Sequence, residues 1–284
     1  MTPKELISIV ITTYNRSDAL AQVLAALEQQ SDRRFEVVVA DDGSSQEHLS
    51  HAISIQRAVS FPVTHVWHPD VGFTASKVRN LGVARAAGTY VILLDGDCVP
   101  EVDFVARHRM LAEHGCFVNG SRVLLNKYLT ALVLAGKAEL LNQSMWQWVA
   151  RKLKGESSKW GGKLRLPDMF LRRQAAFKWK GIRSCNMSLH KADYIAVNGF
   201  DETFVGWGHE DADFVLRLHN AGLNRKNGFF STEVYHLWHR ESSRDMENVN
   251  AQRVRERISS GQIEATIGYQ QSLGFDEVQV FTQR

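Results

Sequence analysis

The sequence predicts an α/β fold in which a twisted, mostly parallel sheet is flanked by helices and joined to a smaller second lobe. Short β-branched runs alternate with helical patterns through the first half, which is typical of parallel strands joined by crossover helices. Polar and acidic clusters fall where the predicted strands end. With 284 residues, 44% of them hydrophobic and 23% charged, the chain can form a large core, and this composition excludes global disorder.

Four strands are predicted in the first half. The first covers residues 7–13, and Ser17 is expected to cap the helix that follows. The apolar face of that helix consists of Leu20, Val23, Leu24 and Leu27. A later helix is expected to start near Thr74 and to end at Gly88, since glycine is favoured at helix C-termini. The other strands are predicted at residues 35–40, 63–67 and 90–94.

The carboxyl ends of such strands form the ligand crevice of an open α/β sheet. Asp95 and Asp97 end the fourth strand with Gly96 between them, so both carboxylates point the same way if the backbone is extended. Hard oxygen ligands in this position suit Mg²⁺ or Mn²⁺ carrying a diphosphate. Taken alone, the pair also fits a solvated acidic turn.

A second polar cluster follows the second strand. Asp42, Gly43 and Ser44 form a strong turn signal. The same residues could build a nucleotide pocket, in which Asp42 accepts a hydrogen bond from a base N–H and Tyr14, after the first strand, offers an aromatic wall. Both interpretations remain open from these residues alone.

The second half is less regular. We expect a helix over residues 127–153, a basic block over residues 151–180, a strand over residues 182–189, a helix starting near Glu210, and an apolar run at residues 234–238. Within the long helix, residues 132–153 mix Trp146 and Trp148 with lysine and arginine. They fit an ordinary lobe helix or an interfacial helix that lies on anionic lipid.

Charge and cysteine content limit the function classes and the compartment. A net charge of +3, without a basic groove interleaved with aromatic residues, does not indicate nucleic acid as a partner. Cys98, Cys116 and Cys185 are too few and too far apart for a disulfide framework. Residues 1–20 lack signal-peptide character, and no apolar run approaches a membrane span. We expect a cytoplasmic protein, with peripheral contact to the inner face of the membrane as an alternative.

Several segments resemble a known family. The segments SIVITTYNRSDAL, FEVVVADDGSS, ASKVRNLGVARAAGTYVILLDGDCVP and GFDETFVGWGHEDADFVLRL resemble family-2 glycosyltransferases of the GT-A fold. The overlapping segment RSCNMSLHKADYIAVNGFDETFVGWGHEDADF is similar to the carboxy-terminal module of galactosyl- and N-acetylgalactosaminyltransferases, including bacterial chondroitin-type polymerases. The matches extend from about residue 6 to residue 240.

The resemblance implies roles for donor-side residues. Thr12, Tyr14 and Asp42 would hold the uridine of a UDP-sugar. Arg79 would contact the nucleotide-phosphate part. The remaining implied donor-side residues are Asp97, as the main protein ligand of Mn²⁺ or Mg²⁺, and Asp95, on the ribose or on the metal through water.

On the acceptor side, the resemblance implies that Glu210 binds the acceptor and Asp211 is the catalytic base. The chemistry independently needs one such carboxylate, because an inverting transfer requires a group to take the proton of the attacking hydroxyl. Acidic residues at the start of a helix are also stabilised by the helix dipole. These acids could therefore serve the helix alone, without a catalytic role. Trp207 could be core or could stack on a sugar ring. The family usually has a small residue where this chain has His209.

Two histidines follow the last apolar run. His236 and His239 are three residues apart, so in a strand they would face opposite sides and only one would reach the metal. Similar enzymes place a metal-binding histidine in this region. We expect His239 to be that ligand, while His236 could be a strand histidine with its own hydrogen-bond partner.

Together these features predict an inverting glycosyltransferase that moves a hexose or N-acetylhexosamine from a UDP-sugar to a glycan or lipid-linked glycan in bacterial surface polysaccharide or lipopolysaccharide synthesis. Residues 1–123 would bind the nucleotide sugar. Residues 124–284 would carry the acceptor site, the catalytic base and a helical tail, in one compact unit. The alternatives are a nucleotidyltransferase, for which TTYNRSD supplies no glycine-rich basic loop, and a non-catalytic glycan-binding protein.

Overall fold

The structure is a computed structural model that describes residues 5–160, 163–178, 181–240 and 244–283. Its larger sheet contains β1 (Ile7–Thr13), β2 (Phe35–Asp41), β3 (Val63–Trp67), β4 (Tyr90–Asp95), β6 (Cys116–Asn119), β8 (Arg173–Gln174), β9 (Asn186–His190), β10 (Asn224–Asn227) and β12 (Gln279–Gln283). A smaller sheet contains β5 (Cys98–Pro100), β7 (Ser121–Leu124) and β11 (Glu233–His236). The helices are α1 (Ser17–Glu28), α2 (Gln46–Gln56), α3 (Ala75–Arg85), α4 (Phe104–Leu111), α5 (Lys127–Leu134), α6 (Met145–Leu153), α7 (Lys191–Ala196), α8 (Glu210–Asn220), α9 (Glu247–Ser260) and α10 (Tyr269–Leu273), with a 3₁₀ turn at Phe170–Arg172.

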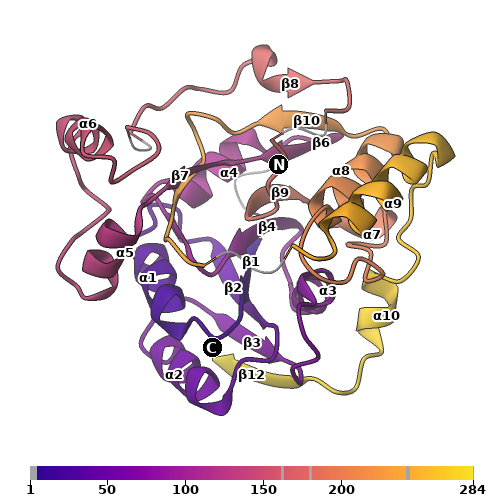
Figure 1. The fold of residues 1–284 in the computed structure, drawn as a ribbon, viewed down its shortest axis with the longest axis horizontal. Helices are drawn as coiled ribbons and strands as arrows, with labels where there is room; N and C mark the ends of the chain where they lie inside the picture. Colours follow the sequence, from indigo (N-terminus) through magenta and orange to yellow (C-terminus); the bar gives the residue numbers. More distant parts are fainter. Residues whose placement is uncertain (1–4, 161–162, 179–180, 241–243, 284) are drawn as a thin grey trace.

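The nine strands of the larger sheet follow the order β12-β3-β2-β1-β4-β9-β6-β10-β8. The strands β3, β2, β1 and β4 are parallel to their neighbours within this set, as predicted. Beyond β4 the sheet is mixed, because β9 is antiparallel to both β4 and β6 while β10 is parallel to β6. A single sheet therefore crosses both halves of the chain (Figure 1).

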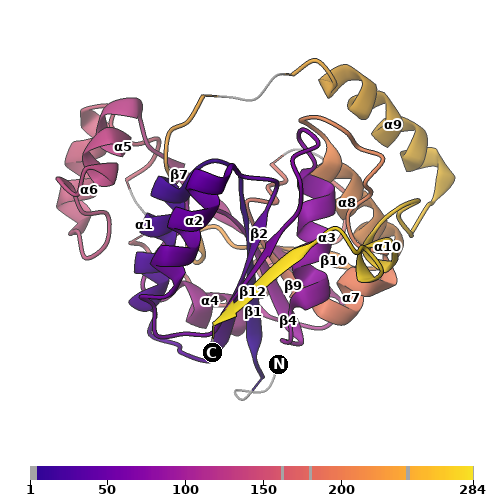
Figure 2. The ribbon, with the colours of Figure 1, turned by 90° about the horizontal axis from the view of Figure 1, so that it is seen from below.

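Alternation along the central strands places apolar side chains on both faces of the sheet. Along β1, Ile7, Ile9 and Ile11 belong to one buried cluster, which includes residues of α1 and α5, whereas Val10 belongs to a second cluster with residues of α3, α7 and α8. The helices accordingly form layers on the two sides of the sheet (Figure 2). Near-continuous apolar runs such as β1 are typical of parallel strands buried on both faces.

The expectation of one helix over residues 127–153 is wrong. The structure contains two helices, α5 and α6, separated by a loop in which Gly136 has a φ of 68°, a conformation that favours glycine. The Asn126 side chain accepts a hydrogen bond from the amide of Leu129 at the start of α5. At the start of α6, Ser144 and Gln147 form a capping box. Two separate N-terminal caps therefore override the continuous apolar pattern.

Two expected helix signals act differently. Ser17 is not a side-chain cap but the first residue of α1, and its hydroxyl lies 2.9 Å from the Nδ1 atoms of both His48 and His51. Gly88 lies beyond the end of α3 rather than at its C-cap. An added Cβ at Gly88 would lie 2.6 Å from the Ser8 Oγ atom, so close packing on β1 requires the glycine.

The carboxy-terminal third also differs from expectation at its strands. The strand β9 begins at Asn186, later than the predicted residue 182, and β12 pairs antiparallel with β3 at the far edge of the sheet, which the sequence did not predict. Lys180, the last residue of the basic block, lies outside the described residues. Within the described ranges no helix has the length and apolar character needed to cross a bilayer. The three cysteines are buried and free.

Candidate active site

The carboxyl ends of β1, β2 and β4 lie side by side, as expected for a ligand crevice in a parallel sheet. The Asp42 amide donates to the Thr13 carbonyl over 2.9 Å, and the Gly96 amide donates to the Thr12 carbonyl over 2.7 Å. These bonds join the turn after β2 and the turn after β4 to the end of β1. The polar clusters predicted from three separate strands therefore meet.

Asp42 joins the turn after β2 to the segment after β3. Its Oδ2 atom accepts from the amide of Thr74 over 2.9 Å, and its Oδ1 atom accepts from the Thr74 hydroxyl and lies 3.2 Å from Nε2 of His68. A carboxylate has about four acceptor positions, and Thr74 fills two of those of Asp42. Tyr14 is exposed, and its hydroxyl donates to Asp70 over 2.9 Å.

Sequence reasoning missed the residues of the turn after β3, namely His68, Asp70 and Thr74. The signal was available, because His68-Pro69-Asp70 directly follows a predicted strand at the same edge of the sheet. Gly43 fixes how closely this turn approaches the turn after β2. It has a φ of 90°, and an added Cβ would lie 2.5 Å from the Cα atom of Asp70.

Arg79 joins the nucleotide side of the crevice to the start of α8. Its Nη2 atom lies 3.3 Å from Oδ1 of Asp95, and its Nη1 atom lies 3.7 Å from Oε1 of Glu210. Although burial opposes the charge, the carboxylates of Asp95, Glu210 and Asp211 raise the pKa of Arg79. Among the described residues Nη1 has no hydrogen-bond acceptor, so this buried cation keeps a donor for an anionic ligand.

The carboxylates beside Arg79 are held in place by hydrogen bonds from neighbouring elements. Thr12 donates its hydroxyl to Oδ1 of Asp95 over 2.9 Å. The amide of Gly208 donates to Oε2 of Glu210 over 3.2 Å. Thr12 at the end of β1 and Glu210 at the start of α8 are therefore brought to the same guanidinium, although 198 positions separate them in the sequence.

The pKa of Asp211 is higher than that of an ordinary aspartate. Burial, and to a lesser extent the neighbouring Glu210 carboxylate, raise the pKa of Asp211 to about 7. Arg79 and the backbone amides of Ala212 and Ser184 act in the opposite direction. A carboxyl group with a pKa near neutrality can accept and release a proton under ordinary conditions, which is the property of a general base.

The shift predicts a pH-dependent effect on stability. The folded-state pKa lies above the ordinary value of about 4, so the contribution of Asp211 is fully present below about pH 4 and is lost as the pH rises through about 7. Asp211→Asn is therefore expected to raise the melting temperature by about 2 to 6 °C at alkaline pH and by less at pH 5. Differential scanning calorimetry of both proteins, with the exposed Asp276→Asn as a control, measures this. An equal gain at both pH values would contradict the assignment.

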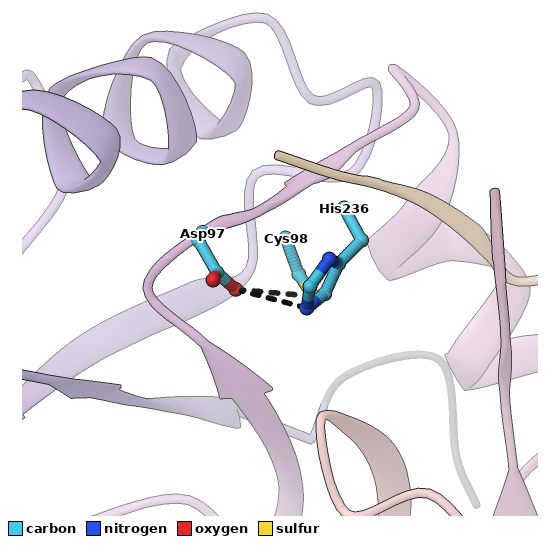
Figure 3. A group of neighbouring side chains, drawn as sticks. All are labelled: Asp97, Cys98 and His236. Carbon is cyan, nitrogen blue, oxygen red and sulfur yellow. Dashed lines mark hydrogen bonds and ion pairs between the residues drawn. The ribbon is translucent and has the colours of Figure 1, made fainter. Parts of the chain in front are cut away.

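Asp97 lies in a cluster with Cys98 and His236 (Figure 3), and His239 lies beside the same carboxylate. The Nε2 atom of His236 lies 3.7 Å from Oδ1 of Asp97, and Nε2 of His239 lies 3.3 Å from Oδ2. The two rings were expected to face opposite sides of a strand, and this expectation is wrong because β11 ends at His236. Strand alternation stops there, and the chain brings both rings to the same carboxylate.

The hydrogen bonds of His239 test whether this cluster suits a cation. Its Nδ1 atom lies 2.9 Å from the Arg240 carbonyl, which can only accept, so Nδ1 carries a proton. In the neutral ring, the Nε2 lone pair then faces a carboxylate oxygen of Asp97, and two lone pairs repel unless a cation or a proton lies between them. Metal-binding histidines commonly donate their second N–H to a carbonyl in this way. The cluster therefore fits a divalent cation.

The other polar groups in this cluster are consistent with that fit. Burial lowers the pKa of His236, which favours the neutral imidazole that metals require. Burial and the neighbouring Cys185 thiol raise the pKa of Cys98 well above its ordinary value, so its sulfur keeps its proton although it lies in the cluster. Asp97 and the two imidazoles are thus the candidate metal donors.

The cation cluster and Asp211 are linked through Asp95. The carboxylate of Asp95 forms an ion pair with Arg79. Its negative charge also raises the pKa of His236, against the larger lowering by burial. Arg79 in turn interacts with Asp211. The sequence predicted that acids from both halves converge on one crevice, and the structure brings Asp95 of the first half and Glu210 of the second half to the same Arg79 guanidinium.

The loop before α8 holds two further expected residues. Trp207 is half-buried, and the Arg244 guanidinium lies over its ring at 4.9 Å from the ring centre, so one indole face is already covered. His209 adopts a left-handed conformation with a φ of 68°. This conformation favours glycine, which gives a physical reason for a small residue at this position in similar proteins.

Sequence comparisons identify relatives of this chain. Residues 8–179 match glycosyl transferase family 2, and residues 171–240 match a family described as the N-terminal domain of galactosyltransferase. Validoxylamine A glucosyltransferase of Streptomyces hygroscopicus subsp. jinggangensis is 30% identical over 77% of this chain and 52% of that protein. Hyaluronan synthase of Pasteurella multocida is 32% identical over 80% of this chain and 23% of that protein. The chain spans about half or less of these relatives.

Solved structures share the fold. The mannosyltransferase PcManGT from Pyrobaculum calidifontis, in complex with GDP-Man and Mn²⁺, has a TM-score of 0.59 at 14% identity and covers 96% of this chain and 73% of its own. S. aureus TarS in complex with UDP has a TM-score of 0.57 at 16% identity and covers 94% of this chain and 68% of its own. These likenesses confirm the GT-A fold. Since the family-2 match covers more than half of the 284 residues, the chain belongs to glycosyl transferase family 2.

Proposed function

We propose that this protein is a metal-dependent, inverting glycosyltransferase that moves a hexose or N-acetylhexosamine from a UDP-sugar to a hydroxyl of a glycan or lipid-linked glycan. The observation that carries the proposal is the network in which Asp95 and Arg79 connect the Asp97 cluster to Asp211. A transfer reaction requires a cation site and a base on one crevice, and this network supports that arrangement.

On the donor side, Thr12, Tyr14 and Asp42 would hold the uridine. Thr74 fills two of the about four acceptor positions on Asp42, and a further one suits a base N–H. Arg79 would donate Nη1 to the phosphates, because that buried atom has no hydrogen-bond acceptor among the described residues. The complex of TarS with UDP supports a UDP-sugar donor.

Asp97, His236 and His239 would hold Mn²⁺ or Mg²⁺, and Asp95 would contact the ribose or the metal through water. The Mn²⁺ in the PcManGT complex supports a divalent cation. When bound, the cation would neutralise the negative charge that develops on the departing diphosphate. Imidazole donors suit Mn²⁺ better than Mg²⁺, which prefers oxygen ligands and water.

Asp211 would act as the base. As the acceptor oxygen forms a bond to the anomeric carbon, the bond from that carbon to the β-phosphate oxygen breaks and its electron pair leaves on UDP. The acceptor hydroxyl proton passes to Asp211, whose pKa of about 7 allows it to take the proton and later release it to solvent. Attack from the face opposite the leaving group inverts the anomeric configuration.

The acceptor would bind at the start of α8. Glu210 would accept a hydrogen bond from an acceptor hydroxyl, and Trp207 would pack its uncovered face on a sugar ring. Residues 1–123 would then serve the donor and residues 124–284 the acceptor. The match to a hyaluronan synthase supports a role in bacterial surface polysaccharide or lipopolysaccharide synthesis.

The proposal is tested by measuring UDP release from a panel of UDP-hexoses and UDP-N-acetylhexosamines, with Mn²⁺, with Mg²⁺ and with a chelator. We expect one donor to be turned over in Mn²⁺ and turnover to stop when the metal is removed. Glycan binding without turnover of any UDP-sugar would favour a non-catalytic glycan-binding protein on the same fold. Membership of the glycosyltransferase family argues against a nucleotidyltransferase.

A further inference from the structure

The helix α6 presents an apolar stripe to solvent. Trp146 and Leu153 are 80% and 83% exposed, and Met145 and Ala150 are also exposed. Trp146, Ala150 and Leu153 are spaced at i, i+4 and i+7, so they lie on one face of the helix. A helix of a soluble protein normally turns such a face towards the core, and here the face is turned outwards.

The opposite side of α6 fixes this orientation. The Trp148 indole is fully buried and stacks on the Tyr235 ring with centroids 4.4 Å apart and planes at 1°. The Arg151 guanidinium lies 3.4 Å from Oε2 of Glu156. Because Trp148 and Arg151 anchor the inner side, the helix cannot rotate to bury Trp146 and Leu153 without losing these contacts.

Positive charge accompanies the apolar stripe. Residues 124–165 contain eight lysine and arginine residues and only two acids, Glu139 and Glu156. Lys152 and Lys154 are exposed next to Leu153. Within Met145–Leu153 the sequence has no acidic residue. An exposed tryptophan and leucine flanked by lysines are the features of a helix that lies in the interface of an anionic bilayer.

The helix pair α5–α6 is also connected to the candidate active site. The two helices lie on the same side of the molecule in both views (Figures 1 and 2). The backbone of Trp238, between the two histidines, donates to the Thr130 hydroxyl of α5 over 2.8 Å. The amide of Leu125, just before α5, donates to the His236 carbonyl over 3.0 Å. A surface bound through α6 would therefore lie on the side of the molecule that carries the histidine cluster.

We propose that the outward face of α6, formed by Met145, Trp146, Ala150 and Leu153 with Lys152 and Lys154 beside it, docks on an anionic lipid surface. Trp146 and Leu153 enter the boundary between head groups and acyl chains, and the lysines contact the lipid phosphates. This docking holds the crevice near lipid-linked acceptors. It extends the proposed function, but vesicle binding requires neither donor nor acceptor and is therefore tested separately from sugar transfer.

Charge decides between lipid and a second copy of the chain as the occupant of this face. In a two-fold dimer formed through α6, Lys152 and Lys154 of both copies would approach each other, and like charges at an interface oppose association. An anionic bilayer instead attracts the same lysines. The basic flank therefore favours the membrane.

The test is co-sedimentation of the full chain with vesicles of phosphatidylcholine alone and with vesicles containing roughly a third phosphatidylglycerol. We expect at least about tenfold tighter binding to the anionic vesicles, weakened by high salt because the Debye length shrinks. Trp146→Ser with Leu153→Ser should lose at least about tenfold of the binding. Lys152→Gln with Lys154→Gln should lose about fivefold for each lysine.

The control is Leu273→Ser, which removes a leucine that is 53% exposed on α10, on the far side of the molecule from α6 (Figure 1). It should bind as tightly as the unaltered protein. A measurement without variants is quenching of tryptophan fluorescence by brominated lipid in the anionic vesicles, which should occur if Trp146 enters the bilayer. Equal binding to both vesicle types, absence of quenching, or a dimer that is lost with Trp146→Ser while no vesicles bind would each overturn the proposal.

Discussion

Replacing Asp211 with asparagine is expected to slow sugar transfer by about 10² to 10⁴-fold, the usual contribution of a general base, while UDP affinity stays nearly unchanged. The reason is that asparagine keeps the size and hydrogen-bonding shape of the side chain but cannot accept the proton of the attacking hydroxyl. This loss corresponds to about 3 to 5 kcal/mol of transition-state stabilisation. Steady-state kinetics with the accepted donor, together with calorimetric titration of UDP, measure both quantities.

A matched control lies two residues along the same helix. The carboxylate of Asp213 is fully buried and pairs with Arg217 at 2.8 Å and with Arg257. Asp213→Asn should therefore lower the melting temperature, because the ion pairs with Arg217 and Arg257 are broken, while the protein that remains folded keeps its rate of transfer. A selective loss of transfer in Asp213→Asn, with full activity in Asp211→Asn, would reverse the two assignments.

The pH dependence of transfer belongs to the same prediction. Asp211 must be ionised to accept a proton, and its pKa is raised to about 7. The rate should therefore fall about tenfold for each pH unit below 7 and level off above it, in contrast to stability, which Asp211 lowers as the pH rises. In Asp211→Asn the residual rate should lose this inflection. A profile unaltered by the substitution would assign the titration to another group.

Removing the carboxylate of Asp97 is expected to abolish metal-dependent UDP binding. Loss of a residue that merely orients a metal ligand typically costs 10 to 100-fold in metal affinity, so loss of a direct ligand should cost at least about 100-fold. Titration of UDP into Asp97→Ala with and without Mn²⁺ should give the same weak affinity. The unaltered protein should bind more tightly when Mn²⁺ is present.

Two comparisons sharpen the Asp97 experiment. Asp276→Ala removes an exposed acid far from Asp97 in the sequence and should leave Mn²⁺-dependent UDP binding intact. His236→Ala and His239→Ala should each weaken it, because both Nε2 atoms lie within 4 Å of the Asp97 carboxylate. Retention of full metal dependence in Asp97→Ala would place the cation elsewhere.

The sequence predicted the parts of the fold that depend on local pattern. The four strands up to β4 have long β-branched runs, and α8 starts at Glu210 as expected. The break between α5 and α6 was missed because an apolar pattern continued through it, while Gly136, Asn126 and Ser144 stop one helix and start the next. The pairing of β12 with β3 was missed because nothing local in a strand specifies which distant edge it joins.

The candidate site also combines features that the sequence predicted with features that depend on tertiary contacts. The expectation that Asp95, Asp97 and Asp211 converge followed from strand ends and from family resemblance. The contact of both His236 and His239 with Asp97 could not be predicted, because it depends on where β11 stops. The turn with His68 and Thr74 was also missed. Its residues act by holding Asp42 through tertiary hydrogen bonds, which leave no periodic signal in the sequence.

A crystal of the protein soaked with UDP and Mn²⁺, examined by anomalous diffraction at the manganese edge, tests the shared crevice most directly. We predict an anomalous peak within coordination distance of the Asp97 carboxylate, with the pyrophosphate of UDP beside it and the Asp211 carboxyl group facing the open side of the same pocket. A manganese peak remote from Asp97, or UDP bound where Asp211 cannot face it, would contradict the proposal.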